Sequence, residues 1–373
     1  MLNKYLILLF SLIITACGEN SPGFTSDSDS STTEESSDFF SSTSDECNDF
    51  LPAPSHFFPD TINDPLYSEQ WHINSSYTQT VIDSEAHIHT ANYLSLYTGK
   101  NIKIAVIDDG LDVTHEDLQS AVTHTFDIAT NCNNVSHNRN EYHGTAVTGI
   151  LGARSNSLGI KGIASNSEIL FLKFKDSMSD SEFITLFNKA DEWGADIINN
   201  SWGTGNVSQS VKDTIVNLSK NGRNGKGINI VFATGNTNSS LGNDESAIPE
   251  VISVGASSET NDRASYSNWG AELDILSPAG ENLGIQSLDP MEALGFSPTD
   301  HYLSISGTSA AAPIVSGVIA LLLEKNPDLS SSEISVLLHD SAEKIGTEAY
   351  IDGRNDKYGY GKVHLSNAIQ AIP

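Results

Sequence analysis

The sequence predicts an α/β domain in which a doubly wound, mainly parallel sheet lies between helices in three layers. From about residue 101, short apolar runs alternate with segments of helical period, which is typical of buried parallel strands joined by helices. Polar motifs follow several of these runs. In doubly wound α/β folds ligands bind beyond the carboxyl ends of the strands, so polar residues are expected at these positions. We interpret as strands the runs 102–107, 168–172, 197–199, 228–233 and 251–254.

Size, charge and cysteine content narrow the functional classes. The chain has 373 residues, 38% of them hydrophobic, which is enough for one large domain or two small ones. Its 48 acidic residues against 19 Lys and Arg give a net charge of -29, a field that repels nucleic acid, so we expect no nucleic-acid partner. Three cysteines are too few for a disulfide scaffold, and their spacing matches no zinc site.

The first segment, residues 1–16, is typical of a signal peptide. Lys4 is its only charged residue, and the apolar run 6–14 is too short for a permanent membrane helix. The residues Ile14-Thr15-Ala16 before Cys17 resemble a bacterial lipobox, which predicts a lipidated Cys17 that anchors the protein in a membrane. We therefore expect the protein at the cell surface or on the periplasmic face of the outer membrane. The alternative is an ordinary secretory signal and a secreted protein.

Residues 17–60 predict a disordered acidic tether. Between Gly18 and Asp60 there are 15 Ser or Thr, ten Asp or Glu and no Lys or Arg. Such a segment has too little apolar surface to offset the entropy of ordering, and its charges repel one another. The folded domain is therefore expected to span residues 61–373.

Three polar motifs fall where strands are expected to end or helices to begin. Asp108 directly follows the strand 102–107. His143 is the first residue of an expected helix and is followed by Gly144. Ser309 lies among small residues before an apolar helix. Each motif alone has an ordinary explanation as a turn, a helix cap or a helix start. Together, in the chain order Asp, His, Ser, they supply an orienting acid, a general base and a nucleophile.

These motifs resemble the signatures around the catalytic residues of subtilisin-like serine proteases, and the likeness runs from about Asp64 to Ala368. Within that superfamily the chain is most similar to the kexin and furin branch, the proprotein convertases. The segments that carry this likeness are 63–67, 70–72, 107–112, 225–227 and 309–313. The resemblance implies the subtilisin-like fold and a serine endopeptidase that cleaves peptide bonds of proteins through an acyl-enzyme.

The resemblance also implies roles for individual residues. Ser309 would be the nucleophile, His143 the base and Asp108 the group that orients the imidazole. Asn236 would donate a hydrogen bond to the oxyanion beside the backbone N–H of Ser309, although a turn residue is its alternative. An extended substrate would pair with strand ends that contain Ser201, Trp202, Gly203, Ala233, Thr234 and Gly235. The alternative for the tryptophan is a core residue.

The segment 154–160 resembles the calcium loop of this family. Three carbonyl oxygens, one amide side chain and two carboxylates would form the ligand set: Arg154, Leu158, Ile160, Asn156, Asp64 and Asp117. Six oxygen ligands with two carboxylates suit Ca²⁺, which would also tie the arm before the first strand to the domain. The alternative is a polar loop beside two capping acids.

The chain departs from the convertases in several ways. Those enzymes select Lys or Arg before the cleaved bond with acids, but Asn206 stands where one acid is expected and no acid lies near Asn188. Asp244 and Glu245 remain as candidates, so a preference for basic residues is a hypothesis. We expect neither a β-rich second domain nor a folded inhibitory propeptide. Folding would then need a separate chaperone-like partner, or Ca²⁺ alone.

Two further features of the sequence allow more than one interpretation. Cys47 and Cys132 could pair in an oxidising compartment or remain two thiols. His87-Ile88-His89 has the spacing of metal ligands, but no third ligand lies nearby in the sequence, which favours a solvated or packed pair.

Two other functions compete with proteolysis. A catalytically silent subtilase fold could serve as a surface binding module, but such a protein has no need to retain Asp108, His143, Asn236 and Ser309 together. An esterase or lipase of the α/β-hydrolase type ranks last, because Ser309 is not in a Gly-x-Ser-x-Gly motif and the order of the three residues differs.

Overall fold

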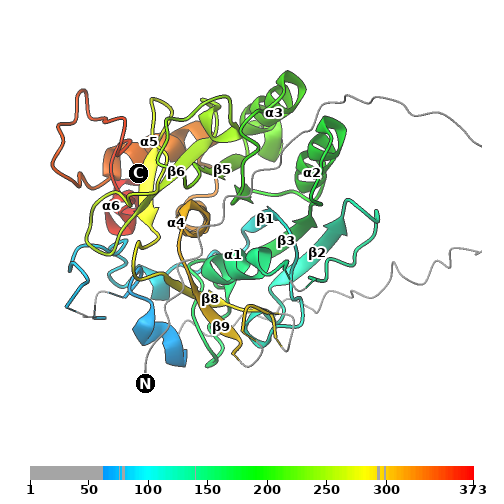
Figure 1. Cartoon of the computed structure of the whole chain (residues 1–373), viewed down its shortest axis with the longest axis horizontal. Coiled ribbons are helices and arrows are strands. Elements are labelled where there is room, and N and C mark those ends of the chain that lie inside the picture. Colours follow the sequence, from blue (N-terminus) through cyan, green and yellow to red (C-terminus); the bar gives the residue numbers. More distant parts are fainter. Residues whose placement is uncertain (1–61, 75, 78–79, 139, 292–294, 298–299) are drawn as a thin grey trace, which may run out of the picture.

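The computed structural model describes residues 62–373 except 75, 78–79, 139, 292–294 and 298–299. The predicted signal peptide and tether, with Cys17 and Cys47, lie outside these residues. Within them, one large sheet carries helices on both faces, and a small two-stranded sheet lies at its side (Figure 1).

The large sheet has seven strands in the order β2-β3-β1-β4-β5-β6-β7, and every pair of neighbours is parallel. The order runs outward from β1 in both directions, which confirms the doubly wound α/β fold. The strands are β1 (Lys103–Asp108), β2 (Val122–Asp127), β3 (Glu168–Lys173), β4 (Ile197–Asn200), β5 (Asn229–Ala233), β6 (Ile252–Ser257) and β7 (Ile275–Pro278).

The five runs predicted from the sequence coincide with β1, β3, β4, β5 and β6, and the largest difference is at β6, which continues to Ser257. The edge strands β2 and β7 were not predicted, nor was the antiparallel pair β8 (Ile285–Leu288) and β9 (Tyr302–Ile305). In β2 an exposed His124 and a half-exposed Thr123 interrupt the apolar residues, at the point where the pairing of β2 with β3 shifts register between Val122 and His124.

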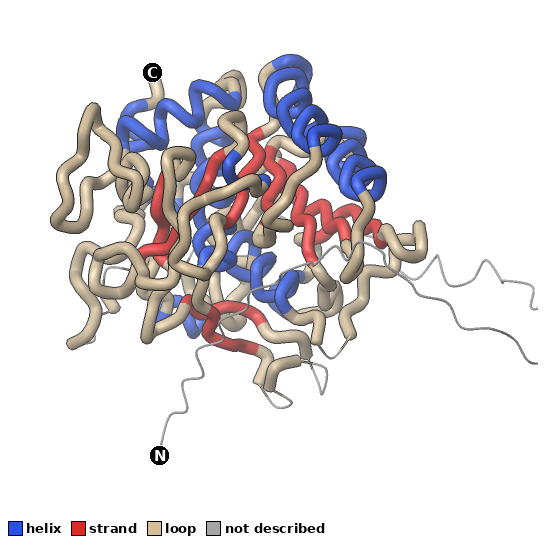
Figure 2. The backbone as a smooth tube through the Cα atoms, turned by 45° about the horizontal axis from the view of Figure 1, so that its top comes forward, coloured by secondary structure: helices blue, strands red, loops and turns tan. Residues whose placement is uncertain are grey.

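Alternate residues of β1, β3, β4 and β5 enter two different cores, one on each face of the sheet. The sheet thus lies between two groups of helices, in three layers (Figure 2). Val106 of β1 packs in the core beneath α1 and α4, whereas Ile107 packs in the core beneath α2 and α3. The helices are α1 (His143–Gly152), α2 (Asp180–Glu192), α3 (Gln209–Gly225), α4 (Thr308–Lys325), α5 (Ser331–Ser341) and α6 (Leu365–Ala371). Within the described residues, α4 alone is long and apolar enough to cross a membrane, and most of it is buried as in a core helix.

The segment before β1 forms an arm, residues 62–95, that packs against the first of these cores. Trp71 is 2% exposed and donates its Nε1–H to the carbonyl oxygen of Gly284 at 3.0 Å. The Gln70 side chain donates to the carbonyl oxygen of Lys161 and accepts from its N–H, both at 2.9 Å. The arm is therefore held to two loops that are distant in the sequence.

Candidate active site

Asp108 and His143 meet where β1 ends and α1 begins. Nδ1 of His143 lies 2.7 Å from Oδ1 of Asp108, whose side chain is fully buried, whereas 29% of the His143 side chain is exposed. Gly144 permits this approach, because a Cβ at that position would lie 2.4 Å from the carbonyl oxygen of Gly110 and 3.0 Å from Cβ of Asp108. A larger residue would push α1 away from β1.

Two neighbouring acids control the charge of His143. Burial alone would lower the pKa of His143, but the charge and hydrogen bond of Asp108 and the charge of Asp109 raise it to about 9. Burial and the charge of Asp108 raise the pKa of Asp109 to about 7. Oδ1 of Asp109 accepts the N–H of Gly144 at 2.8 Å. Asp109 directly follows Asp108 in the chain, but no local pattern in the sequence indicated this role.

Ser309 is the second residue of α4 and lines the same cavity as His143. Its Oγ donates to the carbonyl oxygen of Ser201 at 2.9 Å, and Oγ of Ser201 donates to the carbonyl oxygen of Ser309 at 3.0 Å. The second bond replaces an intrahelical one, because Pro313 has no N–H to offer. Among the described residues, no hydrogen bond joins Ser309 to His143, which is common before a substrate binds.

Asn236 lies beside Ser309 in the wall of this cavity. Its Oδ1 accepts the N–H of Thr308 at 2.8 Å and the Oγ1 hydroxyl of Thr308 at 3.0 Å. The hydroxyl oxygen of Thr308 in turn accepts the N–H of Gly235 at 3.0 Å. Thr308 thereby fixes which side of the Asn236 amide carries its donor. The sequence offered no signal for this role beyond the position of Thr308 next to Ser309.

A cavity of about 440 Å³ opens in front of these groups, and it is lined by all six predicted substrate-binding residues: Ser201, Trp202, Gly203, Ala233, Thr234 and Gly235. They lie at the carboxyl ends of β4 and β5. The indole of Trp202 packs against Phe183 and Phe232, and its Nε1 donates to the carbonyl oxygen of Ile107 at 2.9 Å. Trp202 therefore belongs to the core and supports the cavity wall at the same time.

Asp244 brings negative charge to the cavity beside Gly203. A Cβ on Gly203 would lie 2.7 Å from Oδ2 of Asp244, and this oxygen accepts the N–H of Gly205 at 2.8 Å. Glu245 points elsewhere: its oxygens accept the N–H and the hydroxyl of Thr204, and burial together with the charge of Asp244 raises its pKa to about 7. Of these two acids, Asp244 is the one that lines the cavity.

Asn206 and Asn188, where the sequence lacks an expected acid, lie outside the cavity lining. Asn206 is exposed and accepts a hydrogen bond from Asn243 at 3.0 Å, and Asn188 is exposed on α2. Among the described residues, the acidic side chains of the lining are those of Asp108, Asp109 and Asp244; His143 is the basic group there, and the lining has no Lys or Arg. The cavity is therefore acidic without the two missing acids.

Asp64 and Asp117, the two acids predicted to bind calcium, both contact the loop 154–160, which contains the other four predicted ligands. Oδ1 of Asp64 accepts the N–H groups of Asn156 and Ser157, both at 2.9 Å, and Oδ2 of Asp117 accepts the N–H of Ile160 at 2.9 Å. Oδ1 of Asp117 is buried and has no hydrogen-bond partner among the described residues. Burial and the charges of Asp64 and Glu116 raise the pKa of Asp117 to about 8. This arrangement fits a hard dication.

Of the two cysteines predicted to pair or to remain thiols, Cys132 lies within the described residues and Cys47 does not. Cys132 pairs with Asp127 in a β-bridge after β2 and takes part in a disulfide bond. The partner of Cys132 falls outside the described residues, so its pairing with Cys47 stays a prediction.

Known protein families and sequences are similar to this chain over most of its length. The model described as the Subtilase family matches residues 99–361. The calcium-dependent protease of Nostoc sp. is 30% identical over 347 residues, which cover 82% of this chain and 52% of that protein. Subtilisin E of Bacillus subtilis is 32% identical over 318 residues, which cover 82% of this chain and 75% of that protein. This chain thus spans about half the length of the Nostoc relative and three quarters of subtilisin E.

Solved structures share the fold. A protease of Pseudoalteromonas arctica superposes with a TM-score of 0.71 at 24% identity, over 83% of this chain and 99% of that chain. Fervidolysin of Fervidobacterium pennivorans gives 0.70 at 24% identity, over 87% and 50%. A serine protease of Aeromonas sobria, solved as a complex with a chaperone, gives 0.74 at 20% identity, over 83% and 66%.

Proposed function

This chain belongs to the subtilase family, and on that basis we propose that it is a serine endopeptidase that cleaves peptide bonds of proteins. The observation that carries the proposal is the Asp108–His143 pair at 2.7 Å, which faces the same acidic cavity as Ser309. These residues come from β1, α1 and α4, so the fold itself holds an acid, a base and a hydroxyl around one cavity.

The proposed reaction begins when the hydroxyl of Ser309 gives up its hydrogen bond to the carbonyl oxygen of Ser201. Its Oγ then attacks the carbonyl carbon of the substrate. Its proton passes to Nε2 of His143, which then protonates the leaving amine as the C–N bond breaks. The acyl group remains on Ser309 as an ester until a water molecule, deprotonated by His143, hydrolyses it. Asp108 holds the Nδ1–H of His143 and stabilises the imidazolium in both half-reactions.

The oxyanion formed in each half-reaction would be stabilised by Asn236 and by the backbone N–H of Ser309. Thr308 supports this role, because it occupies Oδ1 of Asn236 and so sets the orientation of the amide. A donor that is already oriented needs no reorganisation during the reaction, which makes it more effective than a mobile one.

We propose Ca²⁺ as a structural cofactor at the loop 154–160, with the six ligands named above. The buried, unpartnered Oδ1 of Asp117 supports a cation, because such a carboxylate oxygen is costly to leave without a counter-charge. The Nostoc relative is named a calcium-dependent protease. The ion would link Asp64 of the arm to the loop, and its role would be to stabilise the fold.

We further propose that the enzyme prefers a basic residue before the cleaved bond, as in the kexin and furin branch. Three acids and no Lys or Arg line the cavity among the described residues, and Asp244 lies beside Gly203, on the strand end expected to pair with substrate. Peptide p-nitroanilides that differ only in Arg or Phe at that position test the preference. We expect Asp244→Asn to lower kcat/KM for Arg about 10-fold and to leave Phe unchanged, whereas the exposed control Asp213→Asn changes neither. Equal turnover of Arg and Phe by the parent enzyme would contradict the proposal.

We propose that lipidated Cys17 anchors the enzyme in a membrane through the acidic tether 17–60. The lipobox-like residues before Cys17 support this proposal. Incorporation of labelled palmitate by the parent chain but not by Cys17→Ala would test it, and equal labelling of the two would overturn it. We also propose that a separate partner assists folding; the Aeromonas sobria neighbour, which was solved with a chaperone, supports this proposal.

Casein hydrolysis by the full chain tests the proposed function. We expect activity and labelling by a fluorophosphonate probe in the parent, and neither in Ser309→Ala. A folded parent chain that neither hydrolyses casein nor reacts with the probe would contradict the proposal and favour a surface binding module. Reaction with the probe without hydrolysis would show an active serine and a substrate other than casein.

A further inference from the structure

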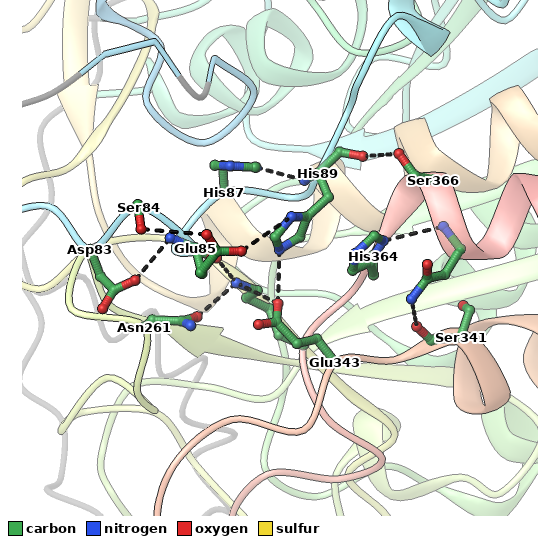
Figure 3. A network of polar contacts seen from close by, with 12 residues as sticks. Asp83, Ser84, Glu85, His87, His89, Asn261, Ser341, Glu343, His364 and Ser366 are labelled. Carbon is green, nitrogen blue, oxygen red and sulfur yellow. Dashed lines mark hydrogen bonds and ion pairs between the residues drawn. The ribbon is translucent and has the colours of Figure 1, made fainter.

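A second cluster of ionisable side chains lies outside the active-site cavity, around His89 of the arm (Figure 3). It contains three histidines that the chain separates widely: His87 and His89 precede β1, and His364 is the N-cap of α6. Glu85 of the arm and Glu343, just after α5, complete it. Local sequence did not reveal this cluster: Glu85 lies only four residues before His89 but was not considered as a ligand, and Glu343 lies 254 residues away.

His89 is the centre of this cluster. Its Nε2 lies 2.9 Å from Oε2 of Glu343, and its Nδ1 lies 3.8 Å from Oε2 of Glu85. One nitrogen of His89 and one oxygen of each glutamate lie within 4.8 Å of one another. Four ligands placed tetrahedrally around Zn²⁺ are about 3.4 Å apart. Because the two glutamates lie against different ring nitrogens of His89, Glu85 must swing toward Nε2 for the three groups to share an ion. Glu85 can make that movement, because its side chain is 58% exposed.

The charges of the cluster leave room for a dication. Asp83, Glu85 and Glu343 carry three negative charges around one buried cation, Lys362. Lys362 contacts Oε2 of Glu343 at 3.0 Å and donates to Asn261 at 2.7 Å. Oε1 of Glu343 makes no hydrogen bond within the described part of the chain. With His89 neutral the net charge of these groups is about -2, which a divalent ion cancels.

The two other histidines enclose His89 without competing as ligands. The His364 ring stacks on the His89 ring with centroids 4.1 Å apart and planes 5° apart, and the His87 centroid is 4.4 Å away. Nδ1 of His87 accepts the N–H of His89, and Nδ1 of His364 accepts the N–H of Asn367, so each neutral ring carries its proton on Nε2. His89 itself has φ of +56°, a left-handed conformation that is uncommon outside glycine and often marks a functional position.

We propose that Glu85, His89 and Glu343 bind Zn²⁺, which clamps the arm to the C-terminal part of the domain. An imidazole nitrogen with two carboxylates suits a borderline metal ion such as Zn²⁺ better than Ca²⁺, which takes oxygen ligands. Backbone bonds already align the two parts, from Leu365 N–H to Ile88 at 2.9 Å and from Ser366 N–H to His89 at 3.2 Å. The ion adds a link between residues 254 positions apart in the chain.

Calorimetric titration with ZnCl₂ tests this site directly. The protein is the full chain without a polyhistidine tag, carrying Ser309→Ala to prevent self-cleavage and saturated with Ca²⁺ to occupy the proposed calcium loop. We expect one Zn²⁺ site, a rise in melting temperature of about 3–5 °C at a hundredfold excess over Kd, and affinity reduced more than about 100-fold in His89→Gln and Glu343→Gln. Glu85→Gln should also weaken binding, and its exposed side chain makes it the variant that keeps the test valid if another fails to fold.

Two control variants decide where the zinc binds. His143→Gln removes the other cluster of a histidine with two acids, formed with Asp108 and Asp109, and should leave the affinity unchanged. His124→Gln removes an exposed histidine on β2 and should also have no effect. Zinc binding that survives His89→Gln, or that is lost in His143→Gln, would overturn the proposal. The absence of binding at about 1 mM Zn²⁺ would overturn it as well and leave His89 and Glu343 as a hydrogen-bonded pair.

Discussion

Replacement of Asp109 by Asn should move the acid limb of the pH–activity profile to lower pH. The charge of Asp109 is one of the causes that raise the pKa of His143. Since His143 must be neutral to accept a proton from Ser309, activity rises as the pH passes upward through this pKa. Asn retains an oxygen that can accept the N–H of Gly144, so the start of α1 should be preserved while the charge is lost.

The structure sets the size of this shift. One ligand atom each of Asp108, Asp109 and His143 lie within 4.8 Å of one another. Two unit charges at that separation interact by about 3.5 kcal/mol at an effective dielectric constant of 20 and by about 0.9 kcal/mol in water. Because 29% of the His143 side chain is exposed, the lower part of this range applies, about 1–2 kcal/mol or roughly 0.7–1.5 pH units. Asp109 has its pKa raised to about 7, so its charge is present where a His143 pKa near 9 places the limb.

The assay is kcat/KM for a short uncharged peptide p-nitroanilide across the pH range, because this ratio reports ionisation of the free enzyme. Asp213→Asn, an exposed acid on α3, is the matched control and should not move the limb. A limb that stays within about 0.2 pH units in Asp109→Asn would refute the electrostatic reasoning. A lower plateau with an unmoved limb would show instead that Asp109 acts on the substrate.

Three further substitutions test the site. Asn236→Ala should lower kcat about 100- to 1000-fold with little change in KM, and steady-state kinetics that put the loss into KM would contradict the oxyanion role. Gly144→Ala should lower both the melting temperature and kcat, because its Cβ would lie 2.4 Å from the carbonyl oxygen of Gly110, and full activity would contradict this packing argument. Asp117→Asn should weaken Ca²⁺ binding at least about 10-fold, yet leave the chelated protein at least as stable as the parent, because it removes a buried carboxylate whose pKa is raised to about 8. Melting curves with Ca²⁺ and with chelator measure both effects, and an equal loss of stability in the two conditions would speak against the calcium site.

The central strands could be predicted from the sequence because strands buried on both faces consist mainly of apolar residues. β1, β3, β4 and β5 are buried along almost their whole length, so each reads as an apolar run. The edge strand β2 has the polar, partly exposed residues Thr123 and His124, which break the run, and the short strands β8 and β9 pair although residues 289–301 separate them in the chain. Burial on both sides is a local signal, whereas pairing across a long connection is not.

The same distinction applies to the functional groups. Asp108, His143 and Ser309 each lie at the end of a regular element, where the flanking apolar or small residues mark the position. The stack of His89 on His364 depends on how the arm and α6 come together, and no local pattern encodes that contact. The proximity of Asp244 to Gly203 likewise depends on the path of the loop after β5. Functional groups whose position depends on one helix or strand can therefore be identified from the sequence. Groups brought together by two distant segments cannot.

The two proposed metal sites lie on the arm, away from the proposed catalytic residues, so the ions would stabilise the fold without taking part in the reaction. Asp64 near one end of the arm contacts the calcium loop, His89 near the other end contacts Glu343, and neither lines the active-site cavity. Between them, Trp71 bonds to Gly284, directly before β8, and β8 packs against α1, whose first residue is His143. Cations on the arm can thus hold the support beneath α1 in place, while the charge of His143 is set inside the cavity by Asp108 and Asp109. A metal ion within the cavity would lower the pKa of His143 against the effect of those acids, whereas ions bound on the arm would leave that pKa to Asp108 and Asp109.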